Sequence, residues 1–341
     1  MYKVSISFPV YNVCDRVEKS LLSALNQTYS NLEFLIIDDK GTDDSMSIIY
    51  EVVSKHERKN QIRFISHKQN LGLGSVRNTS IDYATGEFLY FMDSDDEISF
   101  DCISLLMRYM ESYRVDFIAS SASVILSDGK REKIGYSSIM HWKSNDSILE
   151  NVFIMHNSVP VYMWNKLFSL EFLRGNNLRC IHSYVEDDFF TFRCLCSASS
   201  CLCVPDQTYN YMINGNSITN NLMKKNIPLK TALIYEDIFL RKLELIQKIA
   251  NRKIRNFMLY ETVNIALIRI GMIDISDKID YMQKKNVIEN MMRWPTLNLS
   301  YFLRQNKRVV FKVCFMDLMC LFPLSVRKAL IIKTNNYRIS K

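Results

Sequence analysis

The sequence predicts an α/β protein with a doubly wound, mainly parallel sheet and helices on both faces, followed by an α-helical C-terminal region. Short apolar segments alternate with segments of helical periodicity over residues 1–100, which is the pattern of strands joined by helices. The apolar segment 32–37 is almost continuous, as in a strand buried on both faces of a sheet. From residue 220 onward the pattern is almost wholly helical.

The first hundred residues give four strands and three helices. In chain order we expect strand 3–8, helix 13–27, strand 32–37, helix 44–57, strand 62–65, helix 75–85 and strand 88–92. This order predicts parallel strands joined by right-handed crossovers. Beyond it we expect helix 101–113, strand 116–126, helix 145–157 and a mixture of short elements over 160–211.

Length and composition describe an ordinary globular chain of about two folding units. The chain has 341 residues, of which 48% are hydrophobic and 23% charged. These values exclude a disordered or collagen-like protein. At about 150 residues per domain, we expect one unit over residues 1–219, with halves 1–100 and 101–219, and a second over 220–341.

Charge is distributed unevenly along the chain. Residues 1–100 carry a net charge of −5, whereas residues 220–341 carry 23 Lys or Arg and 9 Asp or Glu, a net charge of +14. The acidic part could hold a cation, and the basic part could face an anionic surface, a membrane or a nucleic acid. Nine cysteines without a regular spacing, and no signal peptide, indicate a cytoplasmic chain with reduced thiols.

Acidic residues follow two of the predicted strands directly. Asp38 and Asp39 end the second strand, and the segment 93–96 (Asp-Ser-Asp-Asp) ends the fourth. The carboxyl ends of parallel strands meet at one edge of the sheet, where ligands bind. Carboxylates gathered there could hold Mg²⁺ or Mn²⁺, and such a metal would hold a diphosphate. The alternative is a pair of solvated acidic turns.

A glycine-containing loop follows the third strand and opens a helix. Its sequence over 70–77 is Asn-Leu-Gly-Leu-Gly-Ser-Val-Arg. The glycines could let the backbone approach a nucleotide, and Arg77 could meet a phosphate. As a dinucleotide-binding fingerprint the loop fails, because it follows the wrong strand and Arg77 stands where the third glycine is needed.

Six motifs in order resemble the family-two glycosyltransferases. They are Ser7-Phe8-Pro9-Val10-Tyr11-Asn12, Ser23-Ala24-Leu25-Asn26-Gln27-Thr28-Tyr29, Asp38-Asp39, Asn70-x-Gly72 with Arg77-Asn78, Ala84-Thr85-Gly86-Glu87, and Asp93-Ser94-Asp95-Asp96. The likeness is strong over residues 3–125 and extends more loosely to about residue 220. It implies a GT-A fold and an inverting, metal-dependent enzyme that uses a nucleotide sugar.

The resemblance implies a role for each residue of the donor half. Pro9, Tyr11 and Asp39 would line the pocket for the base and ribose, and Arg77 would approach the nucleotide. In the aspartate-x-aspartate pair, Asp93 would contact the nucleotide sugar and Asp95 would hold Mn²⁺ or Mg²⁺. Asp96 would help to bind the donor sugar.

The acceptor half of the site would supply the catalytic base. The segments 164–168 and 186–190 resemble the acceptor-side pattern of the family, in which Asp187 is the base, Glu186 precedes it and Trp164 shapes the acceptor site. A hydroxyl is a poor nucleophile, so a carboxylate within hydrogen-bond reach must take its proton. The alternative is that these acids only favour a helix N-terminus through its dipole.

The function implied is transfer of a hexosyl or N-acetylhexosaminyl group, from a nucleoside diphosphate sugar and preferably a UDP-sugar, with inversion. The acceptor would be a saccharide or a lipid-linked saccharide in surface polysaccharide biosynthesis. Two rivals remain open. One is a metal-dependent sugar nucleotidyltransferase, although residues 9–12 replace its basic glycine-rich loop. The other is a non-catalytic partner in a glycan-assembly complex.

Residues 304–333 form a basic, aromatic-rich stretch that is too short and too charged to span a bilayer. Its composition suits the anionic inner face of a cell membrane, with insertion of Phe311, Phe315, Leu318 and Phe322. The alternative is that the same side chains pack within a helical subdomain or in a homodimer. No nucleic-acid partner is expected, because no recognised binding module accompanies the charge.

Overall fold

The computed structural model describes residues 1–126, 129–181, 185–213, 226–305, 307–322 and 326. The chain divides into two compact units. The first comprises Met1–Ile148 and Ser158–Gly215, and the second comprises Leu149–Asn157 and Asn216–Lys341. The boundary expected at residues 219–220 lies outside the described residues.

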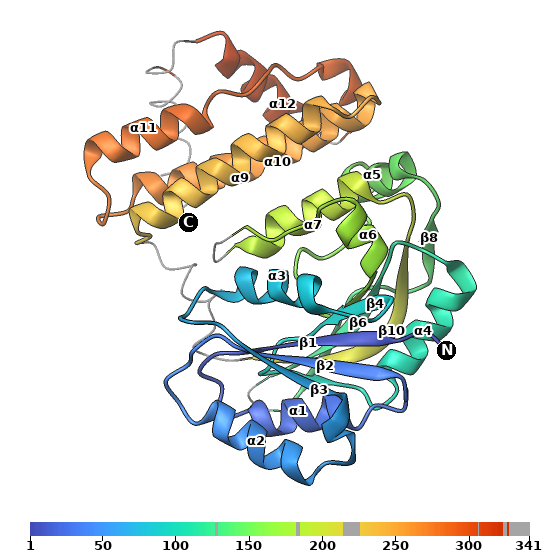
Figure 1. The fold of residues 1–341 in the computed structure, drawn as a ribbon. Coiled ribbons are helices and arrows are strands. Elements are labelled where there is room, and N and C mark those ends of the chain that lie inside the picture. The colour runs from blue at the N-terminus through green and yellow to red at the C-terminus, as the bar shows by residue number, and fades with distance from the viewer. Residues whose placement is uncertain (127–128, 182–184, 214–225, 306, 323–325, 327–341) are drawn as a thin grey trace. The chain divides into compact units, whose positions relative to one another are not determined.

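The first unit is built on one ten-stranded sheet (Figure 1). Its main path runs β3-β2-β1-β4-β9-β6-β10-β5, with β7 paired to β6 and β8 paired to β10. The strands are β1 (Val4–Val10), β2 (Leu32–Asp38), β3 (Ile62–Ser66), β4 (Phe88–Phe91), β5 (Glu97–Ile98), β6 (Phe117–Ile125), β7 (Arg131–Ile134), β8 (Met140–Trp142), β9 (Lys166–Ser169) and β10 (Cys201–Met212). The first four are parallel to one another, as predicted, and β9 is antiparallel to both of its neighbours.

Helices cover both faces of this sheet, which confirms the predicted fold class. They are α1 (Val17–Leu25), α2 (Ser45–Lys55), α3 (Leu73–Tyr83), α4 (Cys102–Tyr113), α6 (Leu170–Gly175) and α7 (Glu186–Ser197), and α5 (Asn145–Phe153) spans the division between the units. Helices α1 and α2 lie on one side of the first strands and α3 lies on the other (Figure 1).

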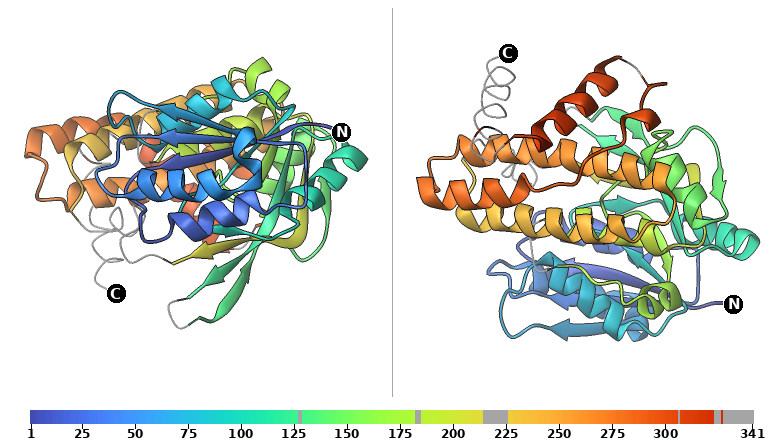
Figure 2. Two further views of the ribbon diagram at one scale, coloured as in Figure 1. Left: turned by 60° about the horizontal axis from the view of Figure 1, so that its bottom comes forward. Right: turned by 90° about the horizontal axis from the view of Figure 1, so that it is seen from above.

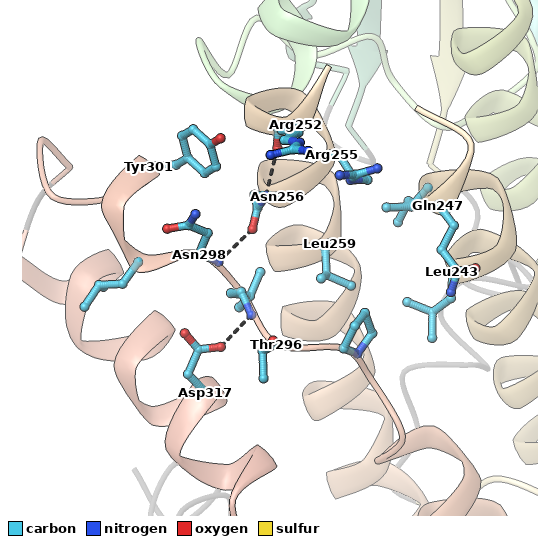
Figure 3. A pocket seen from close by; sticks show the side chains of 14 residues that line it. Leu243, Gln247, Arg252, Arg255, Asn256, Leu259, Thr296, Asn298, Tyr301 and Asp317 are labelled. Carbon is cyan, nitrogen blue, oxygen red and sulfur yellow. Dashed lines mark hydrogen bonds between the residues drawn. The ribbon is translucent and has the colours of Figure 1, made fainter. Parts of the chain in front are cut away.

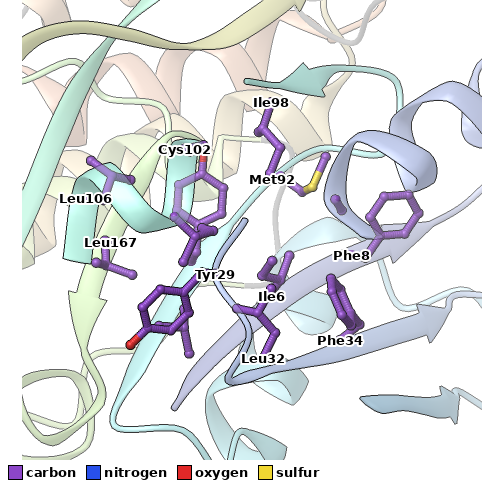
Figure 4. Close-up of a cluster of buried hydrophobic side chains, with 14 of the residues drawn as sticks. Ile6, Phe8, Tyr29, Leu32, Phe34, Met92, Ile98, Cys102, Leu106 and Leu167 are labelled. Atoms are coloured by element: carbon purple, nitrogen blue, oxygen red, sulfur yellow. The ribbon is translucent and has the colours of Figure 1, made fainter. Parts of the chain in front are cut away.

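The two faces of β1 differ in chemistry. Val4, Ile6, Phe8 and Val10 point into an apolar core that includes side chains of α1, α2 and α4 (Figure 4). On the other face, the Ser7 hydroxyl lies 2.6 Å from the Ser80 hydroxyl of α3. Small serines on this face let α3 lie close to the sheet, which brings the helix to the edge where β1, β2 and β4 end.

The second unit is helical. Its main helices are α9 (Leu229–Gln247), α10 (Arg252–Asp274), α11 (Tyr281–Met291) and α12 (Lys307–Cys320). Helices α9 and α10 run alongside each other in both views of Figure 2. Val313, Met316 and Met319 of α12 are buried. Among the described residues, no helix is long and apolar enough to cross a membrane.

Candidate functional site

A single buried arginine gathers the acidic residues that the sequence places at the sheet edge. Arg77 of α3 is 2% exposed. Its Nη2 donates to the Asp93 carboxylate at 3.0 Å, and its Nη1 donates to the Glu186 carboxylate at 2.9 Å and also to Asp187. The loop after β4 and the first turn of α7 therefore meet at Arg77, although they are about ninety residues apart in the chain.

The glycines before Arg77 have structural reasons of their own. Gly72 caps α3 with a φ of +85°, a backbone conformation that side chains rarely adopt. At Gly74, a Cβ atom would lie 2.5 Å from the Ile181 carbonyl oxygen and 3.3 Å from the Glu186 Cβ. The glycine therefore lets the start of α3 approach the chain that leads into α7, and so brings Arg77 within reach of Asp187.

Asp187 has the surroundings expected of a base. Its side chain is 27% exposed, and its carboxylate accepts a hydrogen bond from the Arg77 guanidinium. Burial raises the pKa of Asp187 above its usual range, whereas the Arg77 guanidinium opposes this rise. Burial likewise raises the pKa of Glu186 to about 7. A carboxylate with a raised pKa is a stronger proton acceptor while it remains ionised, so Asp187 can deprotonate a hydroxyl.

Asp96 is engaged in holding the loop after β4 against β10. It is 1% exposed, and its two oxygens accept from the Tyr209 hydroxyl at 2.9 Å and from the Met212 backbone N–H at 2.7 Å. The backbone N–H of Asp93 donates to the Tyr209 oxygen at 3.1 Å. Burial raises the pKa of Asp96, and Asp95 and Asp93 raise it further. These contacts position Asp93, and the predicted contact of Asp96 with the donor sugar stays a prediction.

Asp95 is the residue predicted to hold a cation. Burial raises the pKa of Asp95 to about 6, and the charge of nearby Asp93 adds to this effect. A divalent cation would offset both effects. In the described part of the chain, no three His, Cys, Asp or Glu side chains are placed to hold a metal. One or two aspartates do fit Mg²⁺ or Mn²⁺ that takes its other oxygen ligands from a diphosphate and water.

The pocket predicted for the base of the nucleotide contains a buried, hydrogen-bonded carboxylate and an exposed aromatic ring. Asp39 is 2% exposed, and it accepts from His67 Nδ1 and from the backbone N–H groups of Leu71 and Gly72. It therefore fixes the glycine-containing loop. The Tyr11 ring is 47% exposed and is free to stack on a planar group, whereas neighbouring Pro9 is buried in β1.

His67 was missed in the sequence reading, although a usable signal was present. It follows β3 directly, at the edge where the acids after β2 and β4 also lie. Its Nε2 pairs with the Thr79 hydroxyl of α3 at 2.9 Å, and its Nδ1 pairs with Asp39 at 2.6 Å. The rule for the ends of parallel strands would therefore have placed it beside Asp39.

Trp164 belongs to an aromatic stack. The centroid of its ring lies 3.6 Å from that of the Tyr162 ring, 4.5 Å from that of Tyr209 and 5.4 Å from that of Tyr211, and the rings are nearly parallel. Trp164 is 6% exposed, so its main contacts are with these rings. The spacing of Tyr209 and Tyr211, two apart on a strand and hence on one face, was the available signal for the stack.

A groove of about 620 Å³ lies within the second unit, between α9, α10 and residues 295–301 (Figure 3). The Asn256 side-chain Oδ1 accepts from the Asn298 backbone N–H at 2.7 Å, and the Asp317 carboxylate accepts from the Leu297 backbone N–H. None of the residues predicted for the site lines this groove.

Asp95→Asn should stabilise the metal-free protein. The pKa of Asp95 is higher in the folded chain than in the unfolded chain, so its ionisation opposes folding at pH values above about 6. We expect the free energy of unfolding at pH 8, in chelator, to rise by about 1–3 kcal/mol. The gain should shrink at pH 5, where the folded wild type is already protonated at this position. Chemical unfolding at the two pH values measures it.

The control for this variant is Asp44→Asn, which removes an exposed acid just before α2. It should change stability by less than about 0.5 kcal/mol at either pH. An Asp95→Asn protein that is no more stable than wild type at pH 8 would show that the ionised Asp95 carries no folding penalty. Added Mn²⁺ should stabilise wild type and not Asp95→Asn.

The chain is similar to known glycosyltransferases. Residues 5–174 match the family described as Glycosyl transferase family 2. The putative glycosyltransferase EpsH of Bacillus subtilis (strain 168) is 31% identical over 226 residues, which cover 65% of this chain and 64% of EpsH. The match therefore spans less than two thirds of that relative, and only 20% of an uncharacterized glycosyltransferase of Rickettsia felis that is 38% identical over 128 residues.

Solved structures share the fold. S. aureus TarS 1-349 in complex with UDP-GlcNAc gives a TM-score of 0.69 at 16% identity, over 99% of this chain and 92% of that one. The mannosyltransferase PcManGT from Pyrobaculum calidifontis, in complex with GDP-Man and Mn²⁺, gives 0.51 at 12% identity, over 94% of this chain and 88% of that one. At such identities the likeness establishes the fold alone, which is GT-A. With the family match and the glycosyltransferase relatives, the chain belongs to glycosyltransferase family 2.

Proposed function

We propose that this chain is an inverting transferase that moves a sugar from a nucleoside diphosphate sugar to an acceptor hydroxyl. One observation carries the proposal: the buried Arg77 holds Asp93, expected on the donor, and Asp187, expected on the acceptor, around one guanidinium. The two carboxylates thereby face one point, where a donor and a hydroxyl can react.

Asp187 acts as the general base for the acceptor hydroxyl. Its carboxylate takes the hydroxyl proton while the hydroxyl oxygen bonds to the anomeric carbon from the face opposite the diphosphate. The bond from that carbon to the diphosphate oxygen breaks in the same displacement, and the nucleoside diphosphate leaves. Bound at Asp95, Mn²⁺ or Mg²⁺ would offset the charge that develops on the leaving diphosphate. The exposed Tyr11 ring would stack on the base.

The preferred donor is a UDP-sugar, of the hexosyl or N-acetylhexosaminyl class. The similar TarS structure is described as a complex with UDP-GlcNAc, which supports this preference. The acceptor would be a saccharide or a lipid-linked saccharide in surface polysaccharide biosynthesis. The GDP-Man complex of the mannosyltransferase makes GDP-mannose the donor to test next.

The experiment is a screen of the purified chain against nucleotide sugars with Mn²⁺, in which the released nucleotide is identified. We expect UDP release from a UDP-sugar, faster with acceptor oligosaccharide, and loss of release in chelator. Asp44→Asn should behave as wild type, whereas Asp95→Asn should be inactive. Release of pyrophosphate from UTP and a sugar phosphate would favour a nucleotidyltransferase. No turnover and no donor binding would favour the non-catalytic partner.

We further propose that α12 rests on the anionic cytoplasmic face of a membrane. Of the four side chains expected to insert, Phe311, Leu318 and Phe322 are 73%, 51% and 37% exposed, and Phe315 is half-buried. Leu321 is 77% exposed beside them, and the exposed Lys307 and Arg308 precede them. Apolar side chains beside basic ones suit the membrane interface. The part of this basic stretch beyond residue 322 lies outside the described residues, apart from Val326.

Flotation with lipid vesicles tests this docking. Wild type should float with anionic vesicles and not with neutral ones, and salt should weaken the binding. Replacing Phe311, Leu318 and Leu321 together with Ser should release the protein while donor turnover survives. The matched control replaces Tyr281 and Met282 of α11, which are 70% and 57% exposed. Truncation near residue 300 is a poorer test, because it also removes the buried side chains of α12.

Equal flotation of the triple variant and wild type would exclude this face as the docking surface. A wild type that does not float but forms a dimer by light scattering, with the dimer lost in the triple variant, would support the homodimer instead.

A further inference from the structure

Among the described residues of the first unit, one lysine near the proposed general base is fully buried. Lys166 is the first residue of β9 and is 1% exposed. Its ammonium donates to the carbonyl oxygen of Tyr162 and lies 4.6 Å from the centroid of the Tyr162 ring. Burying an ammonium on one carbonyl and one ring is costly, so this position calls for an explanation.

The lysine closes a short loop that is bonded to the helix carrying Asp187. Lys166 reaches back four residues to the Tyr162 carbonyl, and Asn165 between them adopts a left-handed φ of +57°. The Asn165 side-chain amide donates to the carbonyls of Ser120 and Ser121, at 3.0 Å and 2.9 Å. Val161 adjoins this closed segment, and its carbonyl oxygen accepts from the Thr191 hydroxyl of α7 at 2.6 Å, one turn after Asp187. The lysine thus helps to hold this segment on the helix that carries the base.

The charge of Lys166 also acts on Asp187. The groups facing Asp187 are Arg77 from α3, Asp93 after β4, Glu186 on its own helix and Lys166 from β9. Arg77 and Lys166 favour the ionised form of Asp187, whereas Asp93 and burial oppose it.

Near neutral pH, Lys166 is present both as the ammonium and as the neutral amine. Burial lowers the pKa of Lys166 to about 7, although the Asp187 carboxylate acts to raise it. Arg77 acts in the same direction as burial.

We propose that Lys166 is a positioning residue for sugar transfer, which holds the segment 161–166 on α7 and favours the ionised carboxylate of Asp187. The inference rests on the proposed function, because it takes Asp187 as the general base. It adds a residue that touches neither donor nor acceptor and acts through Asp187. The fixed segment also carries Trp164, so one amine orders both the base and the aromatic stack beside it.

The test compares the pH dependence of kcat/KM in wild type, Lys166→Met and Lys166→Arg, with a UDP-sugar that supports turnover and saturating Mn²⁺. Removing a positive charge raises the pKa of a nearby carboxyl by about one unit or more. In Lys166→Met we therefore expect the rise of activity with pH to move up by about one pH unit. The rate at pH 6.5 should fall about tenfold or more, with the KM for donor unchanged. Lys166→Arg keeps the charge and should keep the position of the rise.

A slower Lys166→Met enzyme with an unmoved pH profile would overturn the inference, because loss of structure alone lowers the rate without shifting the profile. Lys166→Gln, which lacks the charge but keeps a hydrogen-bond donor, replaces Lys166→Met if that variant does not fold. Failure of the proposed function gives a different result. In that case Asp187→Asn would retain transfer, whatever the effect of the Lys166 variants. If Asp187→Asn is inactive and the profile of the uncharged variant is unmoved, only the role of Lys166 fails.

Discussion

Replacing Asp187 with Asn lowers the rate of sugar transfer by a factor of about 10²–10⁴ while the donor still binds. The amide keeps the size of the carboxylate and can still accept from Arg77, but it cannot take a proton from the acceptor hydroxyl. The loss should therefore appear in kcat with acceptor present. Donor affinity, measured by calorimetry with UDP, should change by less than threefold.

The matched control is Asp188→Asn, since Asp188 is the next acid in the first turn of α7. It should retain most of the activity. The opposite result, with Asp188→Asn inactive and Asp187→Asn active, would move the base by one residue. If both variants kept the wild-type rate, neither carboxylate would be the group that accepts the proton.

Replacing Arg77 with Met should destabilise the first unit by about 3–5 kcal/mol at pH 7.5. Removing one side of a buried ion-pair network leaves charges without compensation, and here Asp93, Glu186 and Asp187 would all lose the same cation. Denaturant unfolding measures the loss. Lys at this position keeps the charge but cannot reach three carboxylates with a planar fork, so Arg77→Lys should recover only part of the stability.

The destabilisation by Arg77→Met should lessen as the pH falls. Without the arginine, burial and mutual repulsion raise the pKa values of Glu186 and Asp187 further, and protonation at pH 5 removes the uncompensated charge. The stability difference from wild type should therefore be largest above pH 7 and smaller at pH 5. A variant that matches wild type at pH 7.5 would show that the arginine does not hold these carboxylates in the ionised form.

The sequence by itself determined the architecture of the sheet edge. The alternation of β1 to β4 with helices is local in origin, because strand and helix periodicities are visible in windows of five to fifteen residues. Parallel strands end at one edge, so the positions of Asp39 and Asp93 followed from the element order. The structure and the comparisons confirm this fold, whereas the roles of the individual site residues stay predictions.

Only the tertiary structure decided how the surroundings of the three aspartates after β4 differ. Asp93, Asp95 and Asp96 are neighbours in sequence, yet Asp93 pairs with Arg77, burial raises the pKa of Asp95 to about 6, and Asp96 bonds to Tyr209 and to the Met212 N–H. The partner of Asp93 comes from α3, whereas the partners of Asp96 come from β10, which begins more than a hundred residues later.

The sequence offered no sign that β9 would insert antiparallel between β4 and β6, or that its Lys166 would be buried. Local patterns specify elements, because backbone hydrogen bonds and side-chain periodicity act over a few residues. Burial and charge pairing depend on segments that only folding brings together, so they were decided by the packed structure.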